Sequence, residues 1–86
     1  MNNYEMSIAE EMFAKLGYYR YESKRLESVK YEKGAKEIVF LHYNQSFYAQ
    51  INMSDTNFER FRPMEISVEI MECIKKQIEE FGWKVK

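Results

Sequence analysis

The sequence is short of the residues that stabilise secreted proteins and of the runs that cross membranes. It has one cysteine, Cys73, which cannot form an internal disulfide. Its longest apolar runs reach four residues, far below the roughly 20 that a membrane-spanning helix requires. No basic segment followed by an apolar run opens the chain, as a secretory signal would. We therefore expect a protein of the reducing cytoplasm that does not contact membranes.

Residue types that often carry catalysis are scarce as well. Only three glycines occur, too widely spaced for a phosphate-binding loop. His42 is the only histidine, and no second imidazole or thiol lies near it in sequence to build a metal site or a nucleophile–base pair. A structural role is favoured for His42, and a packing role for Cys73 on the flank of a helical stripe. The sequence predicts a non-catalytic protein with no metal site and no cofactor.

Neither sign of charge dominates the composition. Fourteen acidic residues against thirteen basic ones give a net charge of -1, which excludes the overall signature of a dedicated nucleic-acid binder but leaves room for a local basic patch. The chain is 45% apolar and 16% aromatic, typical of a globular protein. At 86 residues it predicts one domain over residues 1–86 with a thin core.

Two segments have the pattern of capped amphipathic helices. Ser7 and Glu10 form a capping box at the start of the first, and Gly17 suits the left-handed residue that ends it. Ser67 and Gly82 mark the limits of the second. Apolar residues between these limits recur every three or four positions, as one helix face requires. They are Ile8, Ala9, Met12, Phe13 and Leu16 in the first segment, opposite Glu10, Glu11 and Lys15, and Ile70, Met71, Ile74, Ile78 and Phe81 in the second.

Residues 26–32, 37–43 and 47–53 are predicted to be strands. Gly34-Ala35 suits a type II′ hairpin turn, which wants glycine first. That turn pairs Tyr31 with Ile38 and Val29 with Phe40.

A second turn of two or four residues, at residues 44–45, gives the middle strand the same inner face. It would pair His42 with Phe47, Phe40 with Ala49, and Ile38 with Ile51. The predicted fold is α+β: a helix, a three-stranded antiparallel meander and a helix, with both helices packed on one face of the sheet. Residues 18–25 are interpreted as an extended connector that could open with a short strand, and residues 54–63 as a polar loop.

The outer side of the middle strand is also apolar, which makes it a candidate protein-binding surface. A strand that is apolar on both sides is either covered on both faces or meets a partner, and the sequence leaves both alternatives open. The candidate interaction residues are Val39, Leu41, Tyr43 and Tyr48 on this side, with Phe58, Arg60, Phe61 and Arg62 in the polar loop.

Residues 18–36 carry the only stretch that resembles a nucleic-acid surface. Six bases and three acids give it a local net charge of +3. Rings that stack on bases and cations that meet phosphates would be supplied by Tyr19, Arg20, Tyr21, Lys24 and Arg25. We favour the alternative, in which the tyrosines line the junction of helix and sheet and the cations keep a strand edge in solution.

The two ends of the chain resemble a group of short proteins encoded in phages and prophages of Gram-positive bacteria. The shared features are the Leu16-Gly17-Tyr18 helix stop and the run from Lys76 to Trp83, which reads Lys-Gln-Ile-Glu-Glu-Phe-Gly-Trp. The resemblance implies a phage or prophage context and carries over no catalytic residue. Together these features predict a small accessory or adaptor protein that acts by association with itself or with another protein; the alternative is weak binding of single-stranded nucleic acid.

Overall fold

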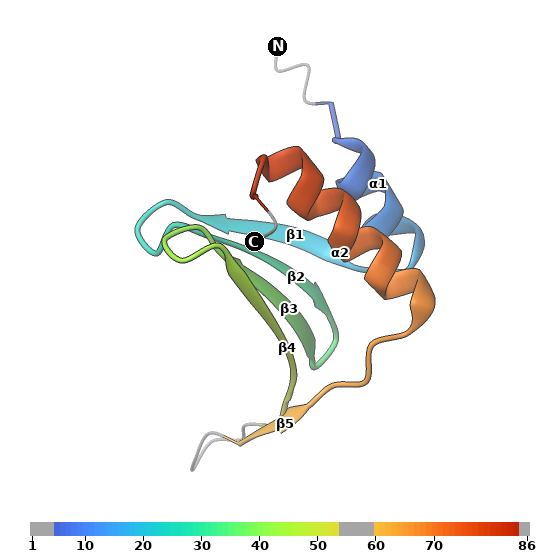
Figure 1. Ribbon diagram of the computed structural model, residues 1–86. Coiled ribbons are helices and arrows are strands. Elements are labelled where there is room, and N and C mark those ends of the chain that lie inside the picture. The colour runs from blue at the N-terminus through green and yellow to red at the C-terminus, as the bar shows by residue number, and fades with distance from the viewer. Residues whose placement is uncertain (1–4, 54–59, 85–86) are drawn as a thin grey trace.

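The computed structural model describes residues 5–53 and 60–84 and contains two helices and one five-stranded sheet (Figure 1). Neighbouring strands are antiparallel and follow the chain in the order β1-β2-β3-β4-β5. The elements are α1 (Ile8–Lys15), β1 (Tyr19–Ser23), β2 (Ser28–Lys33), β3 (Lys36–Leu41), β4 (Ser46–Asn52), β5 (Phe61–Pro63) and α2 (Val68–Phe81).

The structure is α+β, but the expected three-stranded meander is wrong, because strands are added at both of its edges. The connector after α1 forms β1 along β2, and the end of the expected polar loop forms the three-residue strand β5 along β4. Arg20 and Glu22 of β1 lie on the same face as the apolar core, so the alternation of this strand is the reverse of that of an ordinary half-buried strand. Pro63 confines β5 to the sheet edge, since it cannot donate to a further strand.

The first predicted hairpin register is confirmed and the second is wrong by two residues. Tyr31 pairs with Ile38 and Val29 with Phe40 around Gly34, whose φ is +58°. In the next hairpin Phe40 pairs with Phe47, where Ala49 was expected. The loop between β3 and β4 is one four-residue turn at residues 42–45, which moves the pairing by two positions. A shift of two leaves every side chain on its predicted face.

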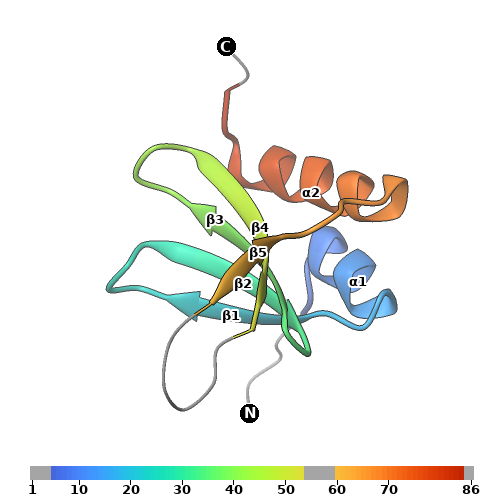
Figure 2. The ribbon, with the colours of Figure 1, turned by 90° about the horizontal axis from the view of Figure 1, so that it is seen from below.

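Both helices lie on the same side of the sheet and build one core with its inner face (Figures 1 and 2). Phe13 of α1 stacks on Tyr31 of β2, with ring centroids 3.8 Å apart, and meets Phe40 of β3 edge-on. Ile70, Cys73 and Ile74 of α2 complete the buried cluster. The predicted inner face is therefore confirmed.

The predicted helix ends are confirmed. The Ser7 and Ser67 hydroxyls accept hydrogen bonds from the Glu10 and Ile70 amides, and Gly82 adopts φ 72° as the left-handed end of α2. Two details of α1 differ from the expected stripe, because Ile8 is exposed while Glu10 is buried. In the part of the chain that the structure describes, no helix is long and apolar enough to cross a membrane.

Candidate interaction surfaces

The outer face of the sheet, opposite the helices, is built of three rows of side chains that run across the strands. The strand pairings place Glu32, Glu37 and Gln50 in the row on one side of the middle row, and three serines in the row on its other side. Lys30 and Val39 lie between the two tyrosines of the middle row. The rows are Tyr19, Glu32, Glu37 and Gln50; Tyr21, Lys30, Val39 and Tyr48; and Ser23, Ser28, Leu41 and Ser46.

The middle row forms an exposed aromatic surface over a buried floor. Val39 on β3 is only 6% exposed, whereas Tyr21 on β1 and Tyr48 on β4 are 54% and 43% exposed. Leu26, in the β1–β2 hairpin loop, is exposed next to them, and these residues line a hollow of about 260 Å³. We call Tyr21, Leu26, Val39 and Tyr48 the tyrosine face.

The adjoining outer row is polar and internally bonded. The Glu37 carboxylate is buried and accepts hydrogen bonds from the Gln50 amide at 3.1 Å and the Asn52 amide at 3.5 Å. Lys30 forms an ion pair with Glu32 at 3.2 Å. These contacts fix the polar edge of the tyrosine face, which is the arrangement of an apolar patch with a polar rim.

The structure brings together some of the predicted interaction residues and separates others. Val39, Leu41 and Tyr48 lie on the outer face, with Leu41 half-buried, whereas Tyr43 is exposed in the β3–β4 turn. The strand β5 carries Phe61 and Arg62 on opposite faces, and Arg60 precedes it. Phe58 lies outside the described residues.

The aromatic-basic segment is divided between two faces. Tyr19 and Tyr21 point outward from β1, whereas Arg20 between them points to the inner face. Lys24 and Arg25 lie in the hairpin loop that follows. The two tyrosine rings and the Arg20 guanidinium are therefore not arranged on one surface.

Arg20 is part of a hydrogen-bond network that sequence reasoning missed. Its guanidinium donates to the Tyr31 hydroxyl at 2.9 Å and to the Gln77 side-chain carbonyl at 3.1 Å, and it pairs with Glu22 at 2.6 Å. The Tyr31 hydroxyl donates to the same Gln77 carbonyl. Burial raises the pKa of Tyr31 to about 12, although the Arg20 charge acts in the opposite direction. The network joins β1, β2 and α2 and holds the Arg20 guanidinium on the inner face of the sheet.

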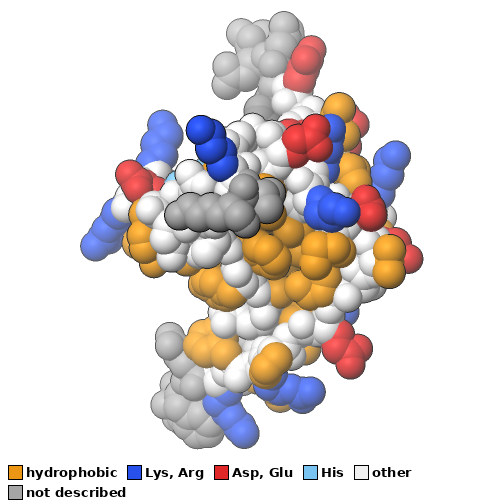
Figure 3. Space-filling view, viewed as in Figure 1, with side chains coloured by type: hydrophobic (Ala, Val, Ile, Leu, Met, Phe, Trp, Pro, Cys, Tyr) orange, Lys and Arg blue, Asp and Glu red, His pale blue; other side chains and the backbone are white. Residues whose placement is uncertain are grey.

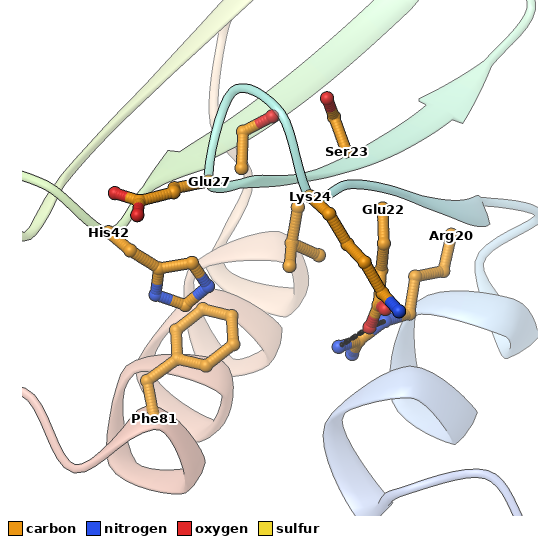
Figure 4. A pocket seen from close by; sticks show the side chains of 9 residues that line it. Arg20, Glu22, Ser23, Lys24, Glu27, His42 and Phe81 are labelled. Atoms are coloured by element: carbon orange, nitrogen blue, oxygen red, sulfur yellow. Dashed lines mark hydrogen bonds and ion pairs between the residues drawn. The ribbon is translucent and has the colours of Figure 1, made fainter.

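A second hollow opens at the end of the sheet beside the last turn of α2 (Figure 4). It measures about 570 Å³ and has the Arg20–Glu22 pair on one side and His42 on the other. The His42 ring meets Phe81 edge-on, with centroids 4.5 Å apart, and Trp83 at 5.7 Å. Lys24 and Glu27 add one charge of each sign, so the hollow has no single charge preference. The observed contacts give His42 a packing role.

Two further groups of the core, the Cys73 thiol and the Tyr18 hydroxyl, favour their neutral forms because their pKa values are raised. Burial raises the pKa of the Cys73 thiol, which is 2% exposed, and burial likewise raises the pKa of Tyr18. Within residues 5–53 and 60–84, no group of three histidine, cysteine or acidic side chains is placed to hold a metal ion.

Tyr21 and Leu26 are candidate interaction residues of the outer face that the sequence pattern did not predict there. Tyr21 was grouped with its basic neighbours, although the alternation in Tyr-Arg-Tyr-Glu-Ser is the signal that puts both tyrosines on one side of a strand. Leu26 was assigned to a strand, but it lies in the loop before β2.

Comparison with protein-family models, with curated proteins and with solved structures gives no match for this chain.

Proposed function

We propose that this chain is a small non-catalytic accessory or adaptor protein that binds another protein through the tyrosine face. The observation that carries this proposal is the exposure of Tyr21 and Tyr48 on either side of the buried Val39, on the sheet face opposite both helices (Figure 2). Tyrosine is enriched at binding hot spots because it buries a large ring with little loss of conformational freedom and keeps a hydroxyl for hydrogen bonding.

The two edge strands, β1 and β5, have features that oppose strand pairing with another chain, so a face of the sheet is the better candidate for the binding surface. β1 directs Arg20 and Glu22 toward the inner face, and β5 is three residues long and contains Pro63. Charged inward-pointing residues, short strands and proline are the features that prevent a sheet from pairing with a strand of another chain. Recognition through side chains of the outer face is therefore favoured over strand addition.

The division of the aromatic-basic segment between two faces favours a protein partner over a nucleic acid. A single-stranded nucleic acid requires rings and cations along one groove. Here the tyrosines are directed away from Arg20, which already bonds Tyr31, Gln77 and Glu22.

The cellular setting belongs to the same proposal. The helix stop at Gly17 and the Lys76–Trp83 run support a phage or prophage context, and the single cysteine supports the cytoplasm. An accessory protein in that setting would act on host or phage proteins in the cytoplasm.

Affinity capture with matched variants tests the proposed function. The full-length tagged chain is expressed in a Gram-positive lysogen as wild type, as Tyr21→Glu with Tyr48→Glu, and as Tyr43→Glu. We expect one protein to co-purify with the wild type and with Tyr43→Glu, which changes an exposed tyrosine outside the tyrosine face. The double variant should lose at least about 90% of it, because a hot-spot pair costs roughly 2 kcal/mol or more.

Nuclease treatment and a series of salt concentrations distinguish a protein partner from the alternative, a single-stranded nucleic acid. A nucleic-acid partner would be removed by nuclease. Its binding would also fall steeply with salt, because Lys and Arg side chains that contact phosphates release the counterions condensed on the nucleic acid. Equal capture by the double variant and the wild type would contradict the tyrosine face as the binding surface.

A further inference from the structure

The inner face of the sheet is covered unevenly by the two helices. Three inward residues of β2 and β3, Tyr31, Ile38 and Phe40, are fully buried. By contrast, the inward residues of β4 are only partly buried where they pack on the same core. Figure 3 shows hydrophobic side chains gathered at the surface below α2, on the side where β4 and β5 lie in Figure 1. The partly buried apolar residues of this region are Phe47, Ala49, Ile51, Ile66 and Ile78.

α2 has a second stripe on the flank that faces away from α1. The α1 side of the helix is identified by Glu80, whose carboxylate accepts a hydrogen bond from the Ala9 amide at 2.9 Å. On the other flank, Val68, Met71, Lys75 and Ile78 follow one another at spacings of three and four. Val68 is 76% exposed and Met71 is 38% exposed. This is the pattern by which one helix packs against another.

Lys75 in this stripe and Glu72 beside it are complementary to the same two residues of a reversed copy of the helix. Glu72, Lys75 and Glu79 are exposed and succeed one another at the same spacing, so the signs alternate along the flank. In an antiparallel pair of α2 helices centred between residues 73 and 74, Lys75 of each copy lies opposite Glu72 of the other. In a parallel pair, like charges would face each other. The pattern therefore selects an antiparallel, two-fold arrangement.

We propose that the occupant of this surface is a second copy of the chain, bound in a two-fold dimer in which the two α2 helices pack antiparallel. Each α2 then adds a third helix to the layer of its partner, at the usual separation of roughly 8–10 Å, over the half-covered apolar residues of β4. The interface is isologous, with Met71 near its centre and Glu72–Lys75 pairs at its sides. It leaves the tyrosine face of both copies free, because that face is on the opposite side of the sheet.

Sedimentation equilibrium of the purified full-length chain tests the dimer. We expect a mass of twice 10.5 kDa at roughly 100 µM protein. Met71→Glu should raise the dissociation constant at least about tenfold, because it puts a carboxylate into an apolar contact. The matched control is Ile8→Glu, which makes the same kind of change at an exposed aliphatic residue of α1 and should leave the dimer intact.

A charge swap tests the antiparallel register. Lys75→Glu alone should weaken the dimer, and Lys75→Glu with Glu72→Lys should restore it, since both changes together rebuild the pairs with reversed polarity. A wild-type chain that stays monomeric at roughly 100 µM, or a Met71→Glu variant that dimerises like the wild type, would overturn the proposal. A swap that fails to restore the dimer would overturn this register. Partner capture by the tyrosine face is measured separately, so failure of one proposal leaves the other to be decided by its own data.

Discussion

At the scale of single residues, the most informative position is Gln77. Its sequence neighbours suggest a solvated residue, yet it is 1% exposed and lies under the Tyr31 hydroxyl. A buried amide carbonyl that accepts two hydrogen bonds is stabilising only while both donors are present. No pattern of apolar spacing predicts such a pair, because it depends on a helix meeting a strand 46 residues away.

Replacing Gln77 tests this network. Gln77→Leu keeps the volume but removes the acceptor of the Tyr31 hydroxyl, which should lower the free energy of unfolding by about 1–3 kcal/mol in urea denaturation. The double variant with Tyr31→Phe removes both partners and should cost less than the sum of the single changes. If the loss of unfolding free energy in the double variant equalled the sum of the two single losses, the network would not be coupled.

The raised pKa of Tyr31 predicts that the stability of the protein depends on pH. Its pKa in the folded protein is about 12 against a usual 10.0, so the folded state binds the proton more tightly than the unfolded state. This contribution to stability is complete below pH 10.0 and is lost as the pH rises toward about 12. Denaturation curves of the wild type should therefore lose stability in this window faster than those of Tyr31→Phe. Parallel losses in both proteins would show that the Tyr31 hydroxyl is not responsible.

At the scale of elements, the sequence predicted what depends on local spacing and missed what depends on neighbours. The caps at Ser7 and Ser67 and the turn at Gly34 follow from one residue type at one position. The strand β1 pairs with β2, and Arg20 bonds the Tyr31 hydroxyl. Its charged residues face the core and its tyrosines face outward, which is the reverse of the pattern by which a half-buried strand is recognised. The two-residue error in the second hairpin arose because two turn lengths gave the same inner face.

Substitutions at Gly82 test whether this one position determines where α2 ends. A Cβ atom at this residue would meet nothing within 4 Å, so the cost of a substitution comes from the backbone alone, which has φ 72°. Gly82→Ala should lower the free energy of unfolding by about 1–2 kcal/mol, because alanine rarely adopts this conformation. Gly82→Asn should cost less, since asparagine tolerates it better. Equal stability of all three proteins would contradict a required left-handed end.

At the scale of the whole molecule, two helices cover one face of a five-stranded sheet and leave two surfaces of different character. The tyrosine face is aromatic and rimmed by bonded polar groups, whereas the flank of α2 is aliphatic and lined by alternating charges. The sequence predicted the outer-face location of Val39, Leu41 and Tyr48 from alternation alone. It could not predict that Tyr21 joins them, because that requires the pairing of β1 with β2 and of β2 with β3.

The central claim is that the tyrosine face contacts another protein, and site-specific photocrosslinking in the lysogen tests it most directly. A photoreactive phenylalanine derivative replaces Tyr48 in one variant and Tyr43 in another, which places the same reactive group on and off this face. On irradiation, the derivative at position 48 should give one crosslinked species with a second protein, and the derivative at position 43 should not. Crosslinking from position 43 but not from position 48, or from neither position, would contradict the claim.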